Sequence, residues 1–130
     1  TGSSVISANY IGTDITGLLA IANQKGIKTN PGHNAYIGAA FPSHNVISGN
    51  ITNGIGINSS TTSVEGNVIG LTASLTSVLP NQSDGIQINI DNVSIGTVNV
   101  NIIARNTLSG LYINNVNSCD VDNCIIGTNS

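Results

Sequence analysis

The chain is poor in the side chains that most binding surfaces use. Its 130 residues include one phenylalanine, three tyrosines, no tryptophan and no methionine, and only 7% are charged. The three basic residues, Lys25, Lys28 and Arg105, are scattered, whereas nucleic-acid binding rests on clustered Lys and Arg. No apolar run approaches the roughly 18 residues of a membrane span. The sequence therefore predicts neither a nucleic-acid partner nor a membrane span.

What the chain does contain in quantity is β-branched aliphatic and small polar side chains. Ile (20) and Val (10) make up most of the apolar content, and Asn (20), Gly (15), Ser (15) and Thr (12) make up most of the remainder. β-branched residues suit pleated strands, and the polar set forms turns. Disordered chains, in contrast, combine high charge with few β-branched residues. The composition predicts an all-β core.

An eight-residue motif that contains Ile-Gly recurs three times, and its glycines are 58 and 57 residues apart. The three copies are residues 6–13, 64–71 and 121–128. A shorter cycle of three apolar anchors lies within this repeat. Two cycles, 45–67 and 101–124, are compact, with lengths of 22 and 23 residues. The other two carry extra residues, 13–23 and 71–81, which end in the similar phrases 19–23 and 78–81.

Three short strands in each compact cycle leave only a few residues for each corner. Stacking equivalent strands of successive cycles in parallel keeps this spacing and places like side chains on like. We therefore predict a right-handed, single-stranded parallel β-helix of about four to five coils, each with three short strands. It forms one domain over residues 1–130, which lacks a secretory signal and an initiating methionine and is expected to be a mature product or part of a longer chain or stacked filament.

The stacking predicts columns of identical side chains along the rod. An inward Asn at a corner can bond to its own turn and to the Asn above and below. The predicted Asn column is Asn9, Asn45, Asn67 and Asn101, with Cys124 in the fifth slot. The predicted aliphatic column is Ile27, Ile55, Ile86 and Leu111. A second aliphatic column is Ile11, Ile47, Ile69, Ile103 and Ile126.

These phrases carry a resemblance to a known group of proteins. Residues 45–50 with 54–57, and residues 66–70 with 79–81 and 85–88, resemble the right-handed β-helix repeats of the pectate-lyase-like superfamily, closest to its adhesin-like secreted and surface members. The resemblance covers essentially the whole chain. It implies the fold more sharply than the function, because that superfamily contains lyases, hydrolases, phage tailspikes and inert stalks.

The catalytic patterns of that superfamily are incomplete in this chain. Its polygalacturonase-like members carry Asn-Thr-Asp, Asp-Asp, a Gly-His-Gly type of turn and Arg-x-Lys, whereas this chain offers Asn106-Thr107-Leu108 and an isolated Asp84. Asp84 precedes a strand and is interpreted as a turn residue. His33 and His44 are too isolated for metal ligation and are interpreted as surface loop residues. We expect no catalytic residue and no cofactor.

The weak candidates for a metal site are three acids. Asp120 and Asp122 share one face of a strand, and Glu65 is expected one coil below, close to Asp122. Calcium requires six to eight oxygen ligands, which these residues supply poorly, so no metal is predicted. The two cysteines, Cys119 and Cys124, are interpreted as buried small side chains in preference to a disulfide.

The sequence thus favours a structural or adhesive module of an extracellular, cell-surface or virion-surface fibre or filament. We expect it to associate with itself end to end or to continue in the same chain, because unpaired parallel strands at an end invite pairing. The alternative is a β-helix that binds or degrades a polysaccharide, with a glycan as a possible ligand. Ice binding, suggested by the Thr- and Ser-rich surface, is a third and weaker hypothesis.

Overall fold

The computed structural model describes residues 2–127, and strands without any helix make up its regular structure in that range. It accordingly contains no helix there that could cross a membrane. The first sheet contains β1 (Gly2–Ile6), β4 (His33–Gly38), β7 (Ser63–Glu65), β10 (Val93–Ile95) and β13 (Cys119–Val121). The second contains β2 (Tyr10–Ile11), β5 (Val46–Ile47), β8 (Val68–Ile69), β11 (Asn101–Ile103) and β14 (Cys124–Ile126). The third contains β3 (Ile27–Lys28), β6 (Ile55–Ile57), β9 (Ile86–Ile88) and β12 (Leu111–Ile113).

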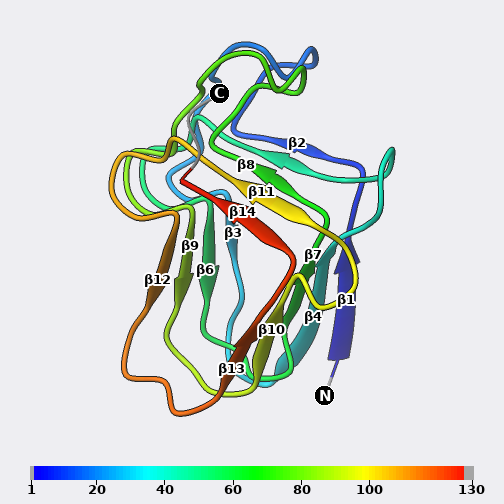
Figure 1. Ribbon diagram of the computed structural model, residues 1–130, viewed down its shortest axis with the longest axis vertical. Coiled ribbons are helices and arrows are strands. Elements are labelled where there is room, and N and C mark those ends of the chain that lie inside the picture. Colours follow the sequence, from blue (N-terminus) through cyan, green and yellow to red (C-terminus); the bar gives the residue numbers. More distant parts are fainter. Residues whose placement is uncertain (1, 128–130) are drawn as a thin grey trace.

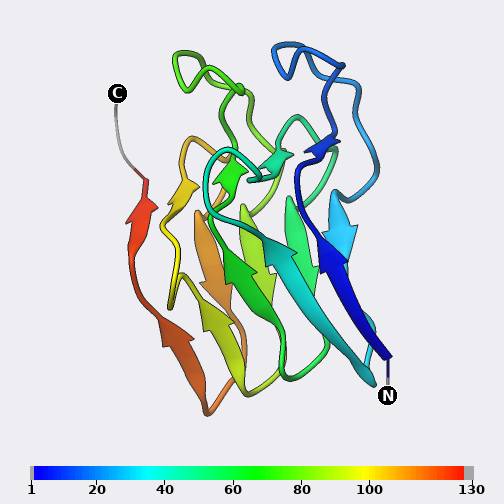
Figure 2. The same cartoon turned by 90° about the vertical axis from the view of Figure 1, so that its right-hand side faces the viewer.

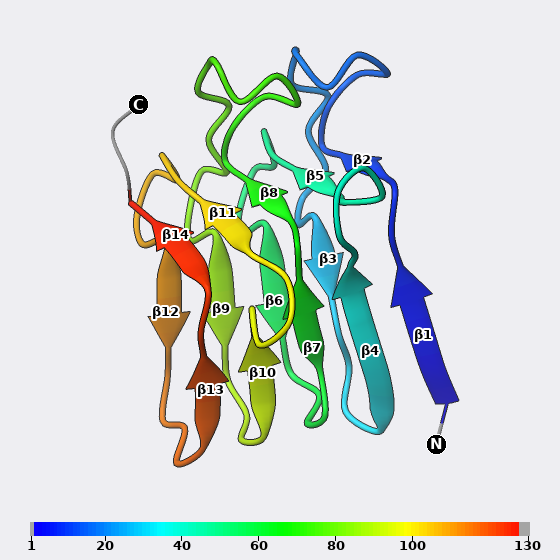
Figure 3. The same ribbon diagram turned by 45° about the vertical axis from the view of Figure 1, so that its right-hand side comes forward.

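The chain visits the three sheets in rotation, so each coil supplies one strand to each sheet (Figures 1 and 3). Neighbouring strands within each sheet are parallel, as in the pairing of β6 with β9. The described residues form four complete coils and the first two strands, β13 and β14, of a fifth. The predicted parallel β-solenoid of short three-stranded coils is therefore confirmed.

The strand register places identical or similar aliphatic side chains above one another, as the sequence predicted. In the third sheet Ile27 pairs with Ile55, Ile55 with Ile86, and Leu111 with Ile86. The column of the second sheet runs through Ile11, Ile47, Ile69, Ile103 and Ile126. These columns and their counterpart in the first sheet form one core between the three sheets. Burial of the aliphatic columns is the main apolar contribution to the stability of this fold.

The insertions alternate between two corners of the coil. In the first and third coils, residues 13–23 and 71–81 extend the corner between the second and third sheets, and each begins with a single antiparallel bridge, Thr13 to Ala20 or Leu71 to Val78. In the second and fourth coils the corner between the first and second sheets is longer, at residues 39–45 and 96–100. Figure 2 shows the two larger loops rising side by side from the rod.

Each insertion after the first coil contacts the backbone of the coil before it. Ala8 donates its N–H to Ser43 O at 2.9 Å, and Gly66 donates to Asn99 O at 3.3 Å. At the other corner, Gly49 donates to Leu79 O at 3.0 Å. A long corner thus covers the short corner of its neighbour, which explains why long and short corners alternate.

The recurring glycine of the Ile-Gly motif has a backbone requirement. Gly12 and Gly70 have φ of +87° and +94°, a region that L side chains rarely adopt. A Cβ at Gly70 would also collide with the Ala104 carbonyl oxygen of the next coil. The motif therefore keeps glycine because the chain turns into a space already filled by the neighbouring coil.

Candidate functional site

The predicted Asn column is a continuous hydrogen-bonded ladder. Asn9 Nδ2 donates to Asn45 Oδ1 at 3.2 Å, Asn45 Nδ2 to Asn67 Oδ1 at 2.9 Å, and Asn67 Nδ2 to Asn101 Oδ1 at 3.1 Å. The side chains also bond to corner carbonyls, as in Asn45 Nδ2 to Ile6 O at 2.8 Å and Asn101 Nδ2 to Val64 O at 2.8 Å. Buried polar groups are costly unless paired, and this ladder pairs them.

The fifth position of this ladder is Cys124, which is half-buried and free. Its Sγ lies 4.0 Å from Ile95 O, a weak contact compared with the amide bonds of the other rungs. Cys119 is also half-buried and free, so neither cysteine is as fully buried as the sequence predicted. Burial raises the pKa of both thiols, which makes them poor nucleophiles.

A second Asn ladder, which we did not predict, runs along the corner between the second and third sheets. Asn23 Nδ2 donates to Asn50 Oδ1 at 3.3 Å, Asn50 Nδ2 to Asn81 Oδ1 at 2.8 Å, and Asn81 Nδ2 to Asn106 Oδ1 at 2.9 Å. The signal was present in the sequence, because Asn50 matches Asn106 in the repeat and both large insertions end in Asn. The two ladders together contain eight asparagine side chains, four in each.

Glu65 is a fully buried acid whose carboxylate organises a neighbouring loop. Oε1 accepts from Ser63 Oγ at 3.1 Å, Thr97 N at 3.1 Å and Thr97 Oγ1 at 2.9 Å, while Oε2 accepts from Val98 N at 3.0 Å and Asn99 N at 2.8 Å. Burial alone would raise the pKa of Glu65, but these hydrogen bonds outweigh it and hold the pKa below its ordinary value. The side chain is therefore a structural anion.

The three weak metal candidates are not brought together. Glu65, the last residue of β7, is equivalent to Asp122, which directly follows β13. The strand β10 lies between β7 and β13, so the expected separation of one coil is wrong and the true separation is two. Asp120 and Asp122 are exposed, and Asp122 Oδ1 accepts from Asn123 N at 2.8 Å. No group of three His, Cys, Asp or Glu side chains suited to a metal ion occurs among residues 2–127.

The remaining acids also stabilise turns. Asp14 accepts hydrogen bonds from Thr16 and from the backbone of Leu18, and Asp91 accepts from Asn117 N at 2.6 Å. The bond from Thr16 lowers the pKa of Asp14, and the bonds from Asn117 lower that of Asp91. Asp84 Oδ1 accepts from Ser109 N at 3.1 Å, which agrees with its interpretation as a turn residue.

The histidines differ from their interpretation as surface loop residues. His33 is exposed but begins β4, and it faces the open end of the first coil. His44 does lie in a loop, yet it is half-buried, and its ring stacks on Phe41 with centroids 3.7 Å apart and planes at 20°. Burial lowers the pKa of His44, because nearby protein disfavours the charged ring more than the Pro42 carbonyl favours it.

The tyrosines do not form a common stacking surface. Tyr10, Tyr36 and Tyr112 lie on β2, β4 and β12, which belong to three different sheets. The polysaccharide alternative predicts a groove lined by stacked aromatic rings. The arrangement of these rings therefore does not favour the polysaccharide alternative.

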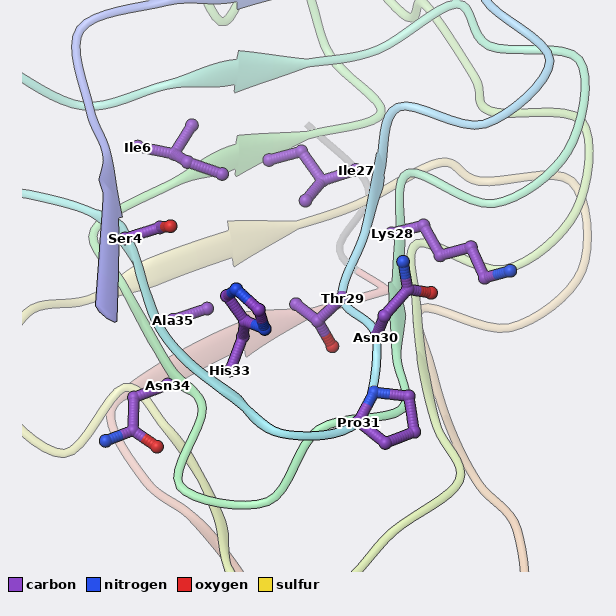
Figure 4. Close-up of a pocket in the computed structure, with 10 residues that line it drawn as sticks. All are labelled: Ser4, Ile6, Ile27, Lys28, Thr29, Asn30, Pro31, His33, Asn34 and Ala35. Carbon is purple, nitrogen blue, oxygen red and sulfur yellow. The ribbon is translucent and has the colours of Figure 1, made fainter. Parts of the chain in front are cut away.

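The first coil contains two hollows. One, of about 330 Å³, opens between β1 and β3, where Ile6 and Ile27 face each other above Thr29 and His33 (Figure 4). The other, of about 430 Å³, is lined by residues of the first corner, including Asn9 and Tyr10. Ile6 and Ile27 belong to the aliphatic columns, so the first hollow is the uncovered end of the core.

Comparisons with protein-family models, with curated proteins and with solved structures find no match to the chain. The likeness to pectate-lyase-like repeats therefore stays a prediction. The ladders stop at the two ends of the described residues. We call them the first-coil face (β1, β2 and β3) and the last-coil face (β12, β13 and β14).

Proposed function

We propose that this chain is a structural β-solenoid module of a stalk, fibre or adhesive filament, lengthened by further coils on its end faces. The observation that carries the proposal is the contrast within one aliphatic column. Ile69 and Ile103 are 0% exposed, whereas Ile126, in the same column, is 41% exposed. An added coil would bury Ile126 as the inner coils bury its equivalents.

The polar side chains support a structural role. The Asn amides bond along the two ladders, and Glu65, Asp14 and Asp91 hold loops and turns. Side chains committed in this way are not free to bind substrate or transfer protons. What they supply is a rigid rod with a repeating surface.

The ladders also give the rod a direction. In each rung the amide nitrogen donates toward the following coil, as Asn9 does to Asn45 and Asn23 does to Asn50. No described residue donates to Asn9 Oδ1 or Asn23 Oδ1 on the first-coil face. These acceptors match the amide donors of a preceding coil, so the proposed rod grows with one polarity.

The proposed location is outside the cell, on a cell surface or on a virion. This part rests on the likeness of the repeat phrases to those of secreted and surface β-helix proteins. Protease treatment of intact cells or virions that carry the native protein tests it, since an external rod is cleaved without lysis. Cleavage only after lysis contradicts this location.

Electron microscopy and fibre diffraction of the native assembly test the rod itself. We expect filaments with a meridional spacing of about 4.8 Å from the coils and, because insertions recur in every second coil, another at about twice that value. Native particles that are compact, with no coils beyond those described, would contradict the proposal.

A further inference from the structure

The long corners of the second and fourth coils are fixed by different side chains. The loop at residues 96–100 is fixed by the Glu65 carboxylate, which accepts hydrogen bonds from the amides of residues 97–99. In the coil before the loop at residues 39–45, the equivalent of Glu65 is Ser7. Ser7 has no carboxylate, so this second loop needs a different anchor.

The loop at residues 39–45, which we call the His44 loop, is closed by an aromatic stack. The His44 ring lies on the Phe41 ring, with centroids 3.7 Å apart and planes at 20°. The same loop is tied to the coil before it through Ser43 O, which accepts a hydrogen bond from Ala8 N at 2.9 Å. Ser43 N donates to Ala40 O at 2.9 Å and completes the turn. The stack and these two bonds define the closed form of the loop.

Both nitrogens of the His44 ring lack a partner. Nδ1 and Nε2 are shielded from solvent, and neither forms a hydrogen bond with a described residue. The Pro42 carbonyl favours the charged ring, yet it does not reach hydrogen-bond geometry with either nitrogen. A neutral imidazole leaves one donor and one acceptor unpaired here, whereas an imidazolium would leave a positive charge and two N–H groups unsolvated. The closed form therefore accommodates the neutral ring better than the charged one.

The segments packed on the His44 loop do not supply a charge that would offset protonation. The loop contains no Asp, Glu, Lys or Arg. The two short corners in contact with it, residues 7–9 of the first coil and 66–67 of the third, contain none either. Glu65 directly precedes the second corner, but its carboxylate is directed into the loop at residues 96–100.

The strands beside the loop add no charge near His44 in acid. Tyr36 on β4 and Tyr10 on β2 are uncharged at acidic pH, and His33 lies at the far end of β4. Burial is the main cause that lowers the pKa of His44, and no charged side chain is among the causes. The response of this ring to pH is therefore set by its own burial.

We propose that the His44 loop is an acid-opened switch, in which protonation of His44 breaks its stack on Phe41 and releases residues 40–44 from the corner of the first coil. The charged ring moves into water, where both of its N–H groups find acceptors. Ser43 O then leaves Ala8 N, and the short corner of the first coil is uncovered. The switch goes beyond the proposed structural role, because it belongs to one lateral corner of the rod.

Both ends of the loop stay fixed when it opens. The Ala39 carbonyl packs against Gly66 of the third coil, where an added Cβ would collide with it. Asn45 belongs to the first Asn ladder and donates to Asn67 Oδ1 at 2.9 Å. The motion is thus confined to residues 40–44.

The direction of the pH dependence follows from linkage. Because the pKa of His44 in the closed loop is below its ordinary value of 6.5, the open loop takes up a proton first as the pH falls. The closed form is fully favoured above that value and loses stability as the pH falls from there through the pKa of the closed form. The pKa of Glu65 is below 4.5, so the loop at residues 96–100 should stay closed over this range.

Amide hydrogen exchange of the whole chain, resolved by NMR, tests the switch. We expect the protection factor of Ala8 N–H, corrected for the intrinsic effect of pH, to fall at least about tenfold between about pH 7.5 and pH 5. Val46 N, which donates to Asn9 O at 2.9 Å, and Asn99 N, which donates to Glu65, should change less than about twofold. An equal loss of protection at all three amides would indicate general unfolding and overturn the switch.

The imidazole proton signals report the stack directly. Above about pH 7 the Phe41 ring should displace the His44 signals from those of the exposed His33. This displacement should vanish with the same midpoint as the protection of Ala8. A His44 that titrates while its signals stay displaced would show that the charged ring remains in the stack, which overturns the switch.

Two variants separate His44 from other titrating groups. His44→Phe keeps a stacking ring that cannot take up a proton, so the protection of Ala8 should become independent of pH over this range. His33→Gln, the matched control, removes an exposed histidine and should retain the fall seen in the unmodified chain. A pH-dependent fall that persists in folded His44→Phe, or disappears in His33→Gln, assigns the effect to another group and overturns the switch.

Phe41→Ala gives a test that does not depend on the folding of His44→Phe. It uncovers one face of the His44 ring and should bring the pKa of His44 closer to its ordinary value, so that the loop opens at a higher pH. Circular dichroism checks the fold of each variant. An unchanged midpoint in Phe41→Ala would show that the stack does not control protonation and would overturn the switch.

Discussion

The third and fifth coils contain nearly the same strands in different surroundings. Ile69 and Ile126 lie in the same aliphatic column, and Asn67 and Cys124 hold equivalent positions in the first Asn ladder. In the third coil both positions are buried, but in the fifth Ile126 is exposed and Cys124 half-buried. The difference arises from neighbours and not from the side chains themselves, because each coil is covered only by the coils beside it. Position along the rod should therefore decide what each substitution costs.

The largest effect on stability is expected in the aliphatic column of the second sheet. Ile69→Ala should lower the free energy of unfolding by about 2–5 kcal/mol, because it removes a buried side chain and leaves a cavity. Ile126→Ala should cost less than about 1 kcal/mol, since that side chain is already in contact with water. Urea unfolding of the two variants measures the contrast. Equal costs would show that burial by neighbouring coils does not set the stability of a rung.

The Asn ladder should give the next largest contrast. Asn67→Ala leaves the Ile37 carbonyl and the Asn45 amide without their partner and should cost about 2–3 kcal/mol. Asn9→Ala removes the exposed first rung, so Asn45 Oδ1 loses the hydrogen bond from Asn9 Nδ2. This substitution should lower the free energy of unfolding by about 1 kcal/mol or less. The measurement is again urea unfolding. A larger cost at Asn9 would mean that the ladder is stabilised from its first rung and not from its middle.

Substitution of Glu65 compares how a buried carboxylate and exposed carboxylates affect the pH dependence of stability. Its pKa in the folded protein lies below the ordinary value of 4.5, so its stabilisation is fully present above that value and is lost as the pH falls through the folded pKa. Glu65→Gln should cost about 1–2 kcal/mol at neutral pH and reduce the loss of stability on acidification. Unfolding measured between about pH 7 and pH 3 tests this, with the exposed Asp120→Asn as control.

Some acid sensitivity should remain in Glu65→Gln, because the pKa values of Asp14 and Asp91 are also lowered. The sign of the effect is the same for all three acids. An unchanged pH profile in Glu65→Gln would show that the loop at residues 97–99 does not depend on the carboxylate.

The smallest expected effect comes from repairing the ladder. Cys124→Asn places an amide where Asn101 can donate to it and should stabilise the chain by about 0.5–1 kcal/mol, measured by thermal unfolding. Cys119→Asn, at the other half-buried thiol, lies outside both ladders and should not stabilise. Stabilisation by both substitutions would attribute the gain to loss of a thiol and not to the ladder.

The sequence was sufficient to predict the columns, because their residues recur at fixed intervals and pair in parallel register. The second Asn ladder was missed for a physical reason. Asn23 and Asn81 are the last residues of the two large insertions, so they fall outside the compact spacing, although the fold returns them to the line of Asn50 and Asn106.

The position of Glu65 shows where a repeat can mislead. The 57-residue interval between Glu65 and Asp122 spans two coils, whereas the interpretation of the sequence placed these acids only one coil apart. Its burial depends on the loop at residues 97–99, more than thirty residues away, whose amides converge on the carboxylate only after the coils have stacked. Nothing in the local sequence distinguishes this acid from an exposed one.

The alternating corners have a consequence for how the chain finds its register during folding. A ladder of Ile upon Ile and Asn upon Asn is nearly degenerate, and a strand that paired one coil too early would satisfy most of the same contacts. Such a slip would bring two large insertions onto one corner, or two short corners together, and the bond from Gly49 to Leu79 would have no counterpart. The alternating loops therefore restrict mispairing to shifts of two whole coils. Fewer segments of the chain can pair after such a shift.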